Sequence, residues 1–140
     1  MPDEVAKDYL QKAQTALRHA HECLDRADYS TSISRSSECV ELSLKCALRL
    51  VGRIPSRSHD LRDDLKAALG QFPSWFQEKV PRFALLSRLT SELRLFATYG
   101  YEDYSAPPRA LFSRAEATAY VDAATEVLNS CHRLQTEQNR

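Results

Sequence analysis

The sequence predicts an all-α protein, an antiparallel four-helix-type bundle with one additional short helix. Apolar residues recur with a period of 3.6 over four long stretches, which is typical of amphipathic helices. Loops rich in Pro, Ser and Gly separate these stretches, and no strand-like alternation competes with them. The 140 residues suffice for one hydrophobic core, so we expect residues 1–140 to form a single domain.

The first two helices are expected over about residues 3–27 and 30–51, separated by the stretch DRADYS. Gly52 follows the second helix and is a favoured residue for ending it. Several serines on this helix would keep it slim, so that neighbouring helices can pack closely against it. Its apolar seam and these small residues are Ile33, Ser34, Ser36, Ser37, Val40, Ser43, Leu44, Ala47 and Val51.

A shorter helix is predicted over about residues 59–69, after the loop RIPSRSHD, with Ser58 as its N-cap. The following segment, GQFPSWFQEKVP, is expected to be a loop that contains a short helical turn. Its large apolar side chains should insert into the core, and they are Phe72, Trp75, Phe76 and Val80.

Another long helix is predicted over about residues 82–98, because Pro81 suits a first helical turn. Its expected buried stripe is Phe83, Leu86, Leu89, Leu93 and Phe96, with Ala97 beside it.

The last helix follows the irregular segment YGYEDYSAPPRALF. Ser113 and Glu116 fit a capping box, in which each side chain satisfies a backbone N–H of the first turn. Apolar spacing continues this helix to about residue 134, and the tail from about 135, TEQNR, is expected to fray.

Composition excludes several classes of protein. Lys plus Arg and Asp plus Glu both number 19, whereas dedicated nucleic-acid binders usually show a basic excess, although a neutral chain can still carry a local basic patch. There is no Gly-rich phosphate loop, no apolar run long enough for a membrane span and no signal peptide. The four cysteines show no CxxC spacing, which indicates reduced thiols in a cytoplasmic protein with no metal site and no cofactor.

The second helix and its exit, SSECVELSLKCALRLVGRIPSRSHDLRDDL, resemble the HEPN domain family. Members carry a Glu-x-x-x-Lys pair, then a Gly, a Pro-containing loop and a His-Asp-Leu-like helix start. Here the pair is Glu41 and Lys45, the Gly is Gly52, and the start is His59 to Leu61. The segments YGYEDYSAPP and SRAEATAYVDAATEVLNSC are similar to the family's C-terminal half, so the resemblance runs from about residue 5 to 134.

The resemblance implies a helical bundle that usually forms a homodimer. Many members are metal-independent ribonucleases with an Arg-x(4–6)-His motif, and the motifs of two subunits face one cleft. Other members are non-catalytic nucleotide-binding or assembly modules. Some are encoded beside a minimal nucleotidyltransferase and act as a toxin with its antidote.

Arg94 fits the family's arginine position, but the motif histidine is absent. The three positions at which the motif allows that histidine are Tyr99, Gly100 and Tyr101. Some toxin members carry Arg-x(4)-His-x-Tyr, and here the same positions are Arg94, Tyr99 and Tyr101. RNA cleavage through the 2′-OH needs a group that moves a proton near pH 7, and tyrosine, with an ordinary pKa of about 10, does this poorly.

Four further residues are candidates for the cleft around Arg94. Glu41 and Lys45, four residues apart, either stabilise their helix as an ion pair or place a polar group beside Arg94. Arg35 would add positive charge to the same cleft. His59 is a weaker candidate, because a role in capping or packing at the start of its helix is favoured.

The loop after Arg94 is the remaining candidate surface. Its aromatic and acidic residues, Tyr99, Tyr101, Glu102, Asp103 and Tyr104, form a possible contact surface or simply cover the end of the bundle.

Three functions follow as hypotheses. The replaced histidine and the neutral charge favour a dimeric, non-catalytic module that binds a nucleotide, RNA or a nucleotidyltransferase partner. The alternative is a metal-independent endoribonuclease of a toxin–antitoxin pair, with Arg94 on the phosphate and Tyr99 or Tyr101 assisting. The third is a helical adaptor that binds no ligand.

Overall fold

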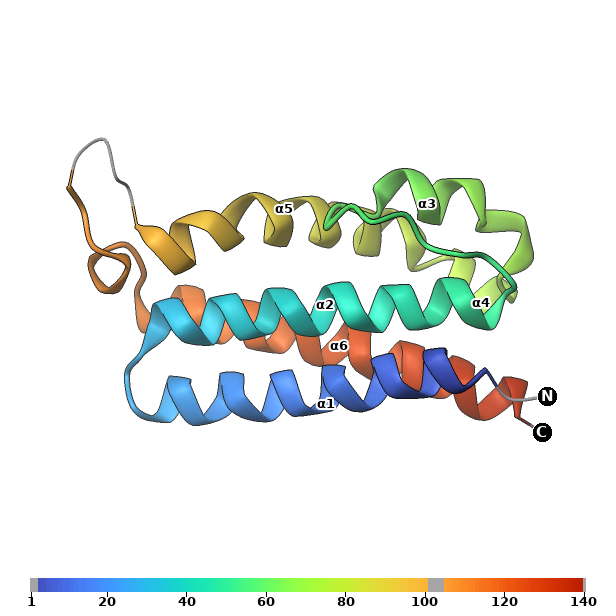
Figure 1. The fold of residues 1–140 in the computed structure, drawn as a ribbon, viewed down its shortest axis with the longest axis horizontal. Coiled ribbons are helices and arrows are strands. Elements are labelled where there is room, and N and C mark those ends of the chain that lie inside the picture. The colour runs from blue at the N-terminus through green and yellow to red at the C-terminus, as the bar shows by residue number, and fades with distance from the viewer. Residues whose placement is uncertain (1–2, 101–104, 140) are drawn as a thin grey trace.

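The protein is an all-α bundle, as the sequence predicts. The structure is a computed structural model that describes residues 3–100 and 105–139. Four long helices run side by side along its length, and both termini lie at one end (Figure 1). The elements are α1 (Glu4–Asp25), α2 (Tyr29–Leu50), α3 (Arg62–Ala67), the 3₁₀ helix η1 (Leu69–Gln71), α4 (Ser74–Gln77), α5 (Val80–Tyr99), the 3₁₀ helix η3 (Pro108–Ala110) and α6 (Arg114–Gln138).

The helix ends follow local chemistry. The side chain of Asp3 accepts hydrogen bonds from the amides of the first turn of α1, and Asp28 does the same for α2. Gly52 follows α2 with φ of +82°, a conformation that glycine adopts without strain. Ser113 and Glu116 form the predicted capping box at the start of α6.

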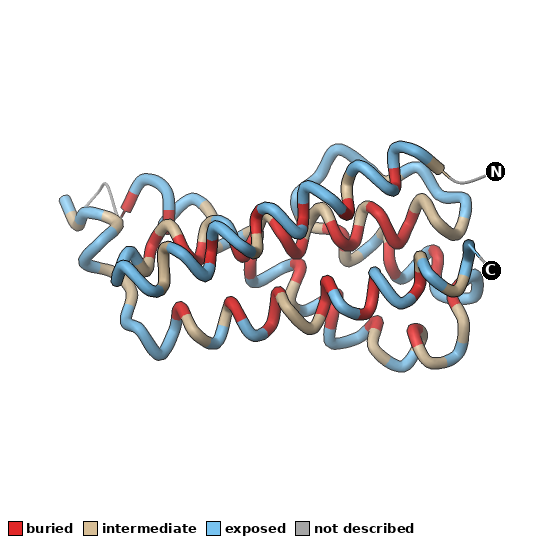
Figure 2. The backbone as a smooth tube through the Cα atoms, turned by 90° about the horizontal axis from the view of Figure 1, so that it is seen from below, coloured by how far each residue is buried: buried red, intermediate tan, exposed pale blue. Residues whose placement is uncertain are grey.

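The core lies between the long helices, along which buried residues recur with exposed residues between them (Figure 2). Small side chains let α1 and α2 approach each other closely, as expected. Ser32 on α2 donates a hydrogen bond of 2.8 Å to the carbonyl of Ala20 on α1. Ser36, Ser37 and Ser43 are also buried. The prediction that small side chains on the second helix allow close packing is therefore confirmed.

Aromatic rings close the end of the bundle that holds the termini. The Phe76 ring lies 4.4 Å from Phe72 and 5.7 Å from Phe83, centre to centre. Trp75 is half-buried, donates a hydrogen bond of 2.9 Å to Glu137 and stacks under Arg133 at 3.9 Å. The predicted insertion of these rings is confirmed, and their stacking ties α4 to α6.

Two predicted boundaries were wrong. The third helix begins at Arg62 instead of residue 59, because Ser58 caps only a short turn: its hydroxyl accepts from the amide of Asp60. At the C-terminus, α6 continues to Gln138 instead of ending near 134. The contact of Glu137 with Trp75 holds this last turn against the bundle, so residues 135–138 are helical.

The predicted buried stripe of α5 was also wrong at two of its five positions. Leu89 and Phe96 are among the exposed large apolar residues. The face that turns inward instead carries Phe83, Ala84, Ser87, Thr90 and Ala97. Because α5 is apolar on both sides, its apolar period alone does not identify the buried face.

Three of the four cysteines are buried thiols. All four are free; Cys39, Cys46 and Cys131 are buried, and Cys23 is half-buried. Burial raises the pKa of the Cys39 and Cys46 thiols to about 12 and that of Cys131 well above its ordinary value. They are therefore inert core residues at neutral pH.

Within residues 3–100 and 105–139, no helix is both long and apolar enough to cross a membrane.

Candidate functional site

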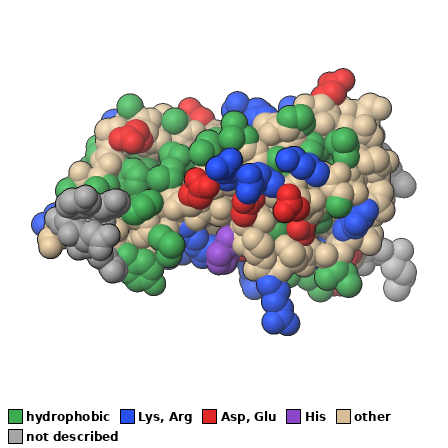
Figure 3. Space-filling model, turned by 90° about the horizontal axis from the view of Figure 1, so that it is seen from above, with side chains coloured by type: hydrophobic (Ala, Val, Ile, Leu, Met, Phe, Trp, Pro, Cys, Tyr) green, Lys and Arg blue, Asp and Glu red, His purple; other side chains and the backbone are tan. Residues whose placement is uncertain are grey.

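A wide polar groove of about 810 Å³ opens between α2, the C-terminal half of α5 and η3. It lies at the end of the bundle opposite the aromatic rings. The face of the molecule formed by α5 and α3 shows charged side chains beside a broad apolar area (Figure 3). The charged and aromatic side chains that line the groove are Arg35, Glu38, His59, Arg94, Tyr99 and Arg109.

Arg94 reaches the groove from the inward face of α5. The same face buries Phe83, then Ser87 and Thr90, so it becomes more polar toward the C-terminal end of the helix. Arg94 is one helical turn beyond Thr90, and its side chain is 35% exposed. The helix therefore directs a guanidinium group toward α2, at a position where the opposite end of α5 places a phenyl ring.

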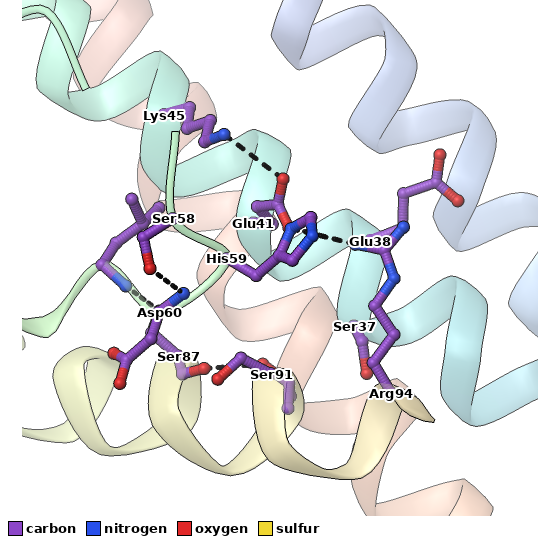
Figure 4. Close-up of polar contacts among 12 residues, drawn as sticks. Ser37, Glu38, Glu41, Lys45, Ser58, His59, Asp60, Ser87, Ser91 and Arg94 are labelled. Carbon is purple, nitrogen blue, oxygen red and sulfur yellow. Dashed lines mark hydrogen bonds and ion pairs between the residues drawn. The ribbon is translucent and has the colours of Figure 1, made fainter. Parts of the chain in front are cut away.

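Glu41 on α2 is the partner of Arg94. Nη1 of Arg94 donates to Oε1 of Glu41 at 3.1 Å, and the carboxylate is only 15% exposed. Lys45 lies 3.4 Å from the other oxygen, Oε2. Glu41 and Lys45 therefore form the predicted helix pair, and of the two only Glu41 also contacts Arg94 (Figure 4).

His59 also contacts Glu41. Its Nδ1 hydrogen-bonds Oε1 of Glu41 and lies 3.3 Å from Nη1 of Arg94. The favoured expectation for this residue, a cap or packing role at the start of the third helix, was wrong because α3 begins three residues later and His59 faces α2 and α5 instead. Glu41 lies 18 residues from His59 in the sequence and Arg94 lies 35 residues from it. Local sequence patterns cannot predict contacts over such separations.

The segment that carries His59 is anchored on α5. The amide of Leu61 donates a hydrogen bond of 2.8 Å to Oγ of Ser87, and both residues are buried. On either side, Ser58 accepts from the amide of Asp60, and the Asp60 carboxylate pairs with Arg62 at 3.0 Å. The His59 side chain is thus exposed, whereas the backbone that carries it is held by α5 (Figure 4).

The remaining groove side chains form its rim. Arg35 pairs with Glu38 at 2.9 Å, and both line the groove, so Arg35 stands in the cleft of Arg94 without touching Glu41. Tyr99, the last residue of α5, is 62% exposed. Arg109 on η3 adds a positive charge that the sequence did not single out, because nothing in the PPRA stretch distinguishes it from a loop arginine.

Four of the predicted contact residues, Tyr101, Glu102, Asp103 and Tyr104, lie outside the described residues. Gly100, which precedes them, has φ of +76°, and a Cβ atom there would lie 2.2 Å from the carbonyl oxygen of Ala106. The chain at this position of the motif therefore has no room for a side chain.

Nothing in the described part of the chain has the arrangement of a metal site: no three His, Cys, Asp or Glu side chains there converge to hold an ion. The groove instead offers guanidinium groups and one imidazole, and the Glu41 carboxylate contacts Arg94 and His59.

Comparison with known proteins identifies the fold and the family. The family model described as HEPN domain matches residues 6–134. Among solved structures, the crystal structure of TT1696 from Thermus thermophilus has a similar fold, with a TM-score of 0.71 and 22% identity over 92% of this chain and 97% of that one. None of the curated proteins gives a match.

Proposed function

The chain belongs to the HEPN domain family, and on this premise we propose that it is a dimeric module that binds a nucleotide or RNA in the groove beside Arg94. The observation that supports the proposal is the position of Arg94, which is directed into an open groove and held there by Glu41. A minimal nucleotidyltransferase is the protein partner that the family resemblance suggests, and it remains part of the proposal.

Phosphate recognition would fall to the arginines. A guanidinium group presents five N–H donors in a planar fork, which suits phosphate oxygens. The only hydrogen bonds that the described residues make with Arg94 use Nη1, so the other N–H groups can donate to a ligand. Arg35 and Arg109 line the same groove and would add donors for neighbouring phosphates.

Base recognition would fall to the apolar side of the groove. Leu95, Tyr99, Pro107 and Pro108 line it there, and the Tyr99 ring is largely exposed. Aromatic rings bind unpaired bases by stacking, and this contact tolerates any base sequence. A groove that is lined by both cations and an aromatic ring fits a single-stranded nucleic acid or a nucleotide.

The proposed dimer would use the outward face of α5. Leu85 is 53% exposed and Leu89 is 38% exposed, and the two lie four residues apart on the same side of the helix. Apolar side chains gathered on one surface are typical of protein contacts. A two-fold axis close to α5 would bring two Arg94 side chains toward one cleft, as the sequence resemblance implies. Light scattering at micromolar concentration should therefore give twice the mass of the chain.

Binding of a fluorescein-labelled single-stranded RNA, followed by anisotropy in EDTA, tests the ligand proposal. We expect Arg94→Gln to weaken binding about 10- to 100-fold, since a charged hydrogen bond contributes about 1.5–3 kcal/mol. Arg82→Gln is the matched control, because Arg82 is exposed and pairs with Glu126 on α6. Equal affinities for the two variants would contradict the site.

Failure of the wild-type protein to bind RNA, and the absence of any rise in its melting temperature with mononucleotides, would favour the ligand-free adaptor.

A further inference from the structure

We propose that His59 supplies the proton transfer that the residues after Arg94 lack, so that the groove cleaves RNA with its reacting side chains in one protomer. This inference rests on the proposed function, since the same groove must first bind RNA. The histidine comes from the segment between α2 and α3, ahead of Arg94 in the chain, and not from the stretch that follows it.

The first support is the shared contact on Glu41. Arg94 donates to Oε1 from Nη1, and the Nδ1–H of His59 donates to the same oxygen in the tautomer that satisfies all three groups. The 3.3 Å between the histidine and arginine nitrogens follows from this sharing. A carboxylate on Nδ1 orients the ring and stabilises the imidazolium that forms when Nε2 takes a proton.

The second support is the direction of the free nitrogen. With Nδ1 on Glu41, Nε2 has no hydrogen-bond partner among residues 3–100 and 105–139. The His59 side chain is 59% exposed and lines the groove. Water and a ribose hydroxyl can therefore reach Nε2, whereas the arginine beside it can reach the adjoining phosphate.

The third support is rigidity. The buried hydrogen bond from the Leu61 amide to Ser87 fixes the backbone two residues after the histidine. Side chains that act in proton transfer are effective when their position is set before the substrate binds. An exposed histidine with only a surface role would need neither a shared carboxylate nor an anchored backbone.

The proposed reaction is internal transesterification. His59 Nε2 takes the proton from a ribose 2′-OH, and the 2′-oxygen forms a bond to the adjacent phosphorus while the P–O5′ bond breaks. Water gives a proton to the leaving 5′-oxygen, and His59 returns its proton to the solvent. The products are a 2′,3′-cyclic phosphate and a 5′-hydroxyl, and Arg94 balances the charge that develops on the phosphate oxygens.

The test compares two RNAs of one sequence, unmodified and fully 2′-O-methylated, both with EDTA. The methylated RNA measures binding, because it has no free 2′-OH. The unmodified RNA measures cleavage, and mass spectrometry identifies its ends. His59→Asn keeps an amide donor near the Nδ1 position but cannot take up a proton. His132→Asn is the matched control on the exposed surface of α6.

We expect wild type and His132→Asn to produce 2′,3′-cyclic phosphate ends at the same rate. His59→Asn should bind the methylated RNA within about threefold of wild type, whereas its cleavage should fall by about 10²- to 10⁴-fold. Cleavage that survives in His59→Asn, or wild-type protein that binds both RNAs and cleaves neither, would overturn the assignment while leaving the proposed binding function intact. Wild-type protein that binds neither RNA would overturn both.

Discussion

The two ends of α5 show how one helix face serves two purposes. Near its N-terminus the inward face places Phe83 against Phe76, inside a large apolar cluster. Near its C-terminus the same face presents Arg94 to Glu41, beside a small cluster whose buried members are Ile33, Ala97 and Ala117. The aromatic end thus supplies stability, whereas the open end leaves space for a groove.

This division means that the groove is not essential to the core. Arg94 and His59 are open to water where they meet the largely buried Glu41 carboxylate, so their pairing with it contributes modestly to folding. Substitutions at the two ends should therefore differ in kind: those at the aromatic end change stability, and those at the open end change ligand chemistry.

The largest expected effect is at the aromatic end. Phe76→Ala should lower the free energy of unfolding by about 3–5 kcal/mol, because it removes a fully buried ring that contacts three other aromatic side chains. Urea denaturation followed by circular dichroism measures the change. Ile54→Ala, at a side chain that is exposed, serves as control and should change stability little. Similar losses of stability in Phe76→Ala and Ile54→Ala would contradict the conclusion that the aromatic end stabilises the fold.

Alkaline pH should lower the stability of the fold, because the buried thiols of the core ionise there. The groove should not contribute to this loss. Because burial raises the pKa of Cys39 and Cys46 from 9.0 to about 12, their contribution is complete below pH 9 and is lost as the pH rises from 9 toward 12. The loss at pH 11 should be on the order of 2 kcal/mol per thiol. Cys46→Ala should therefore show a flatter dependence of stability on pH over this range than wild type. An unchanged slope would contradict the assignment.

Ser87 on α5 holds the segment that carries His59, and removal of its hydroxyl should have an intermediate effect on stability. Ser87→Ala leaves the buried amide of Leu61 without its acceptor, which should cost about 1–3 kcal/mol. Hydrogen exchange should show faster exchange of the Leu61 amide. Ser91→Ala is the control for stability, since the one hydrogen bond of the Ser91 hydroxyl within the described residues goes to the carbonyl of Arg88 on its own helix. Retained protection of Leu61 in Ser87→Ala would show that other contacts hold the segment.

Glu41→Gln should have the smallest effect on stability, about 1 kcal/mol, because the glutamine amide oxygen can still accept from Arg94, which is 35% exposed, whereas only the largely buried Lys45 loses its charged partner. Its effect on the groove has the opposite sign: removal of the negative charge beside Arg94 should tighten RNA binding severalfold. Anisotropy and urea denaturation on one preparation measure both quantities. Weaker binding would mean that Glu41 positions the arginine more than it competes with the ligand.

Local sequence chemistry predicted most of the fold, and distant contacts explain where it failed. Helical periods and caps such as the Ser113 box depend on neighbouring residues, so they were identified directly. The buried face of α5 was not, because Leu89 on its outer side is as apolar as a core residue. The Arg94 position was predicted from the resemblance, but His59 was favoured as a cap or packing residue because it stands at the start of the predicted third helix.

A crystal structure of the protein with a short 2′-O-methylated RNA tests the central claim most directly. We expect a phosphate within about 3 Å of the Arg94 guanidinium, with a ribose 2′-oxygen beside Nε2 of His59 and a base against Tyr99. RNA seated on another surface, with the contact between Arg94 and Glu41 unchanged and no phosphate in the groove, would contradict it.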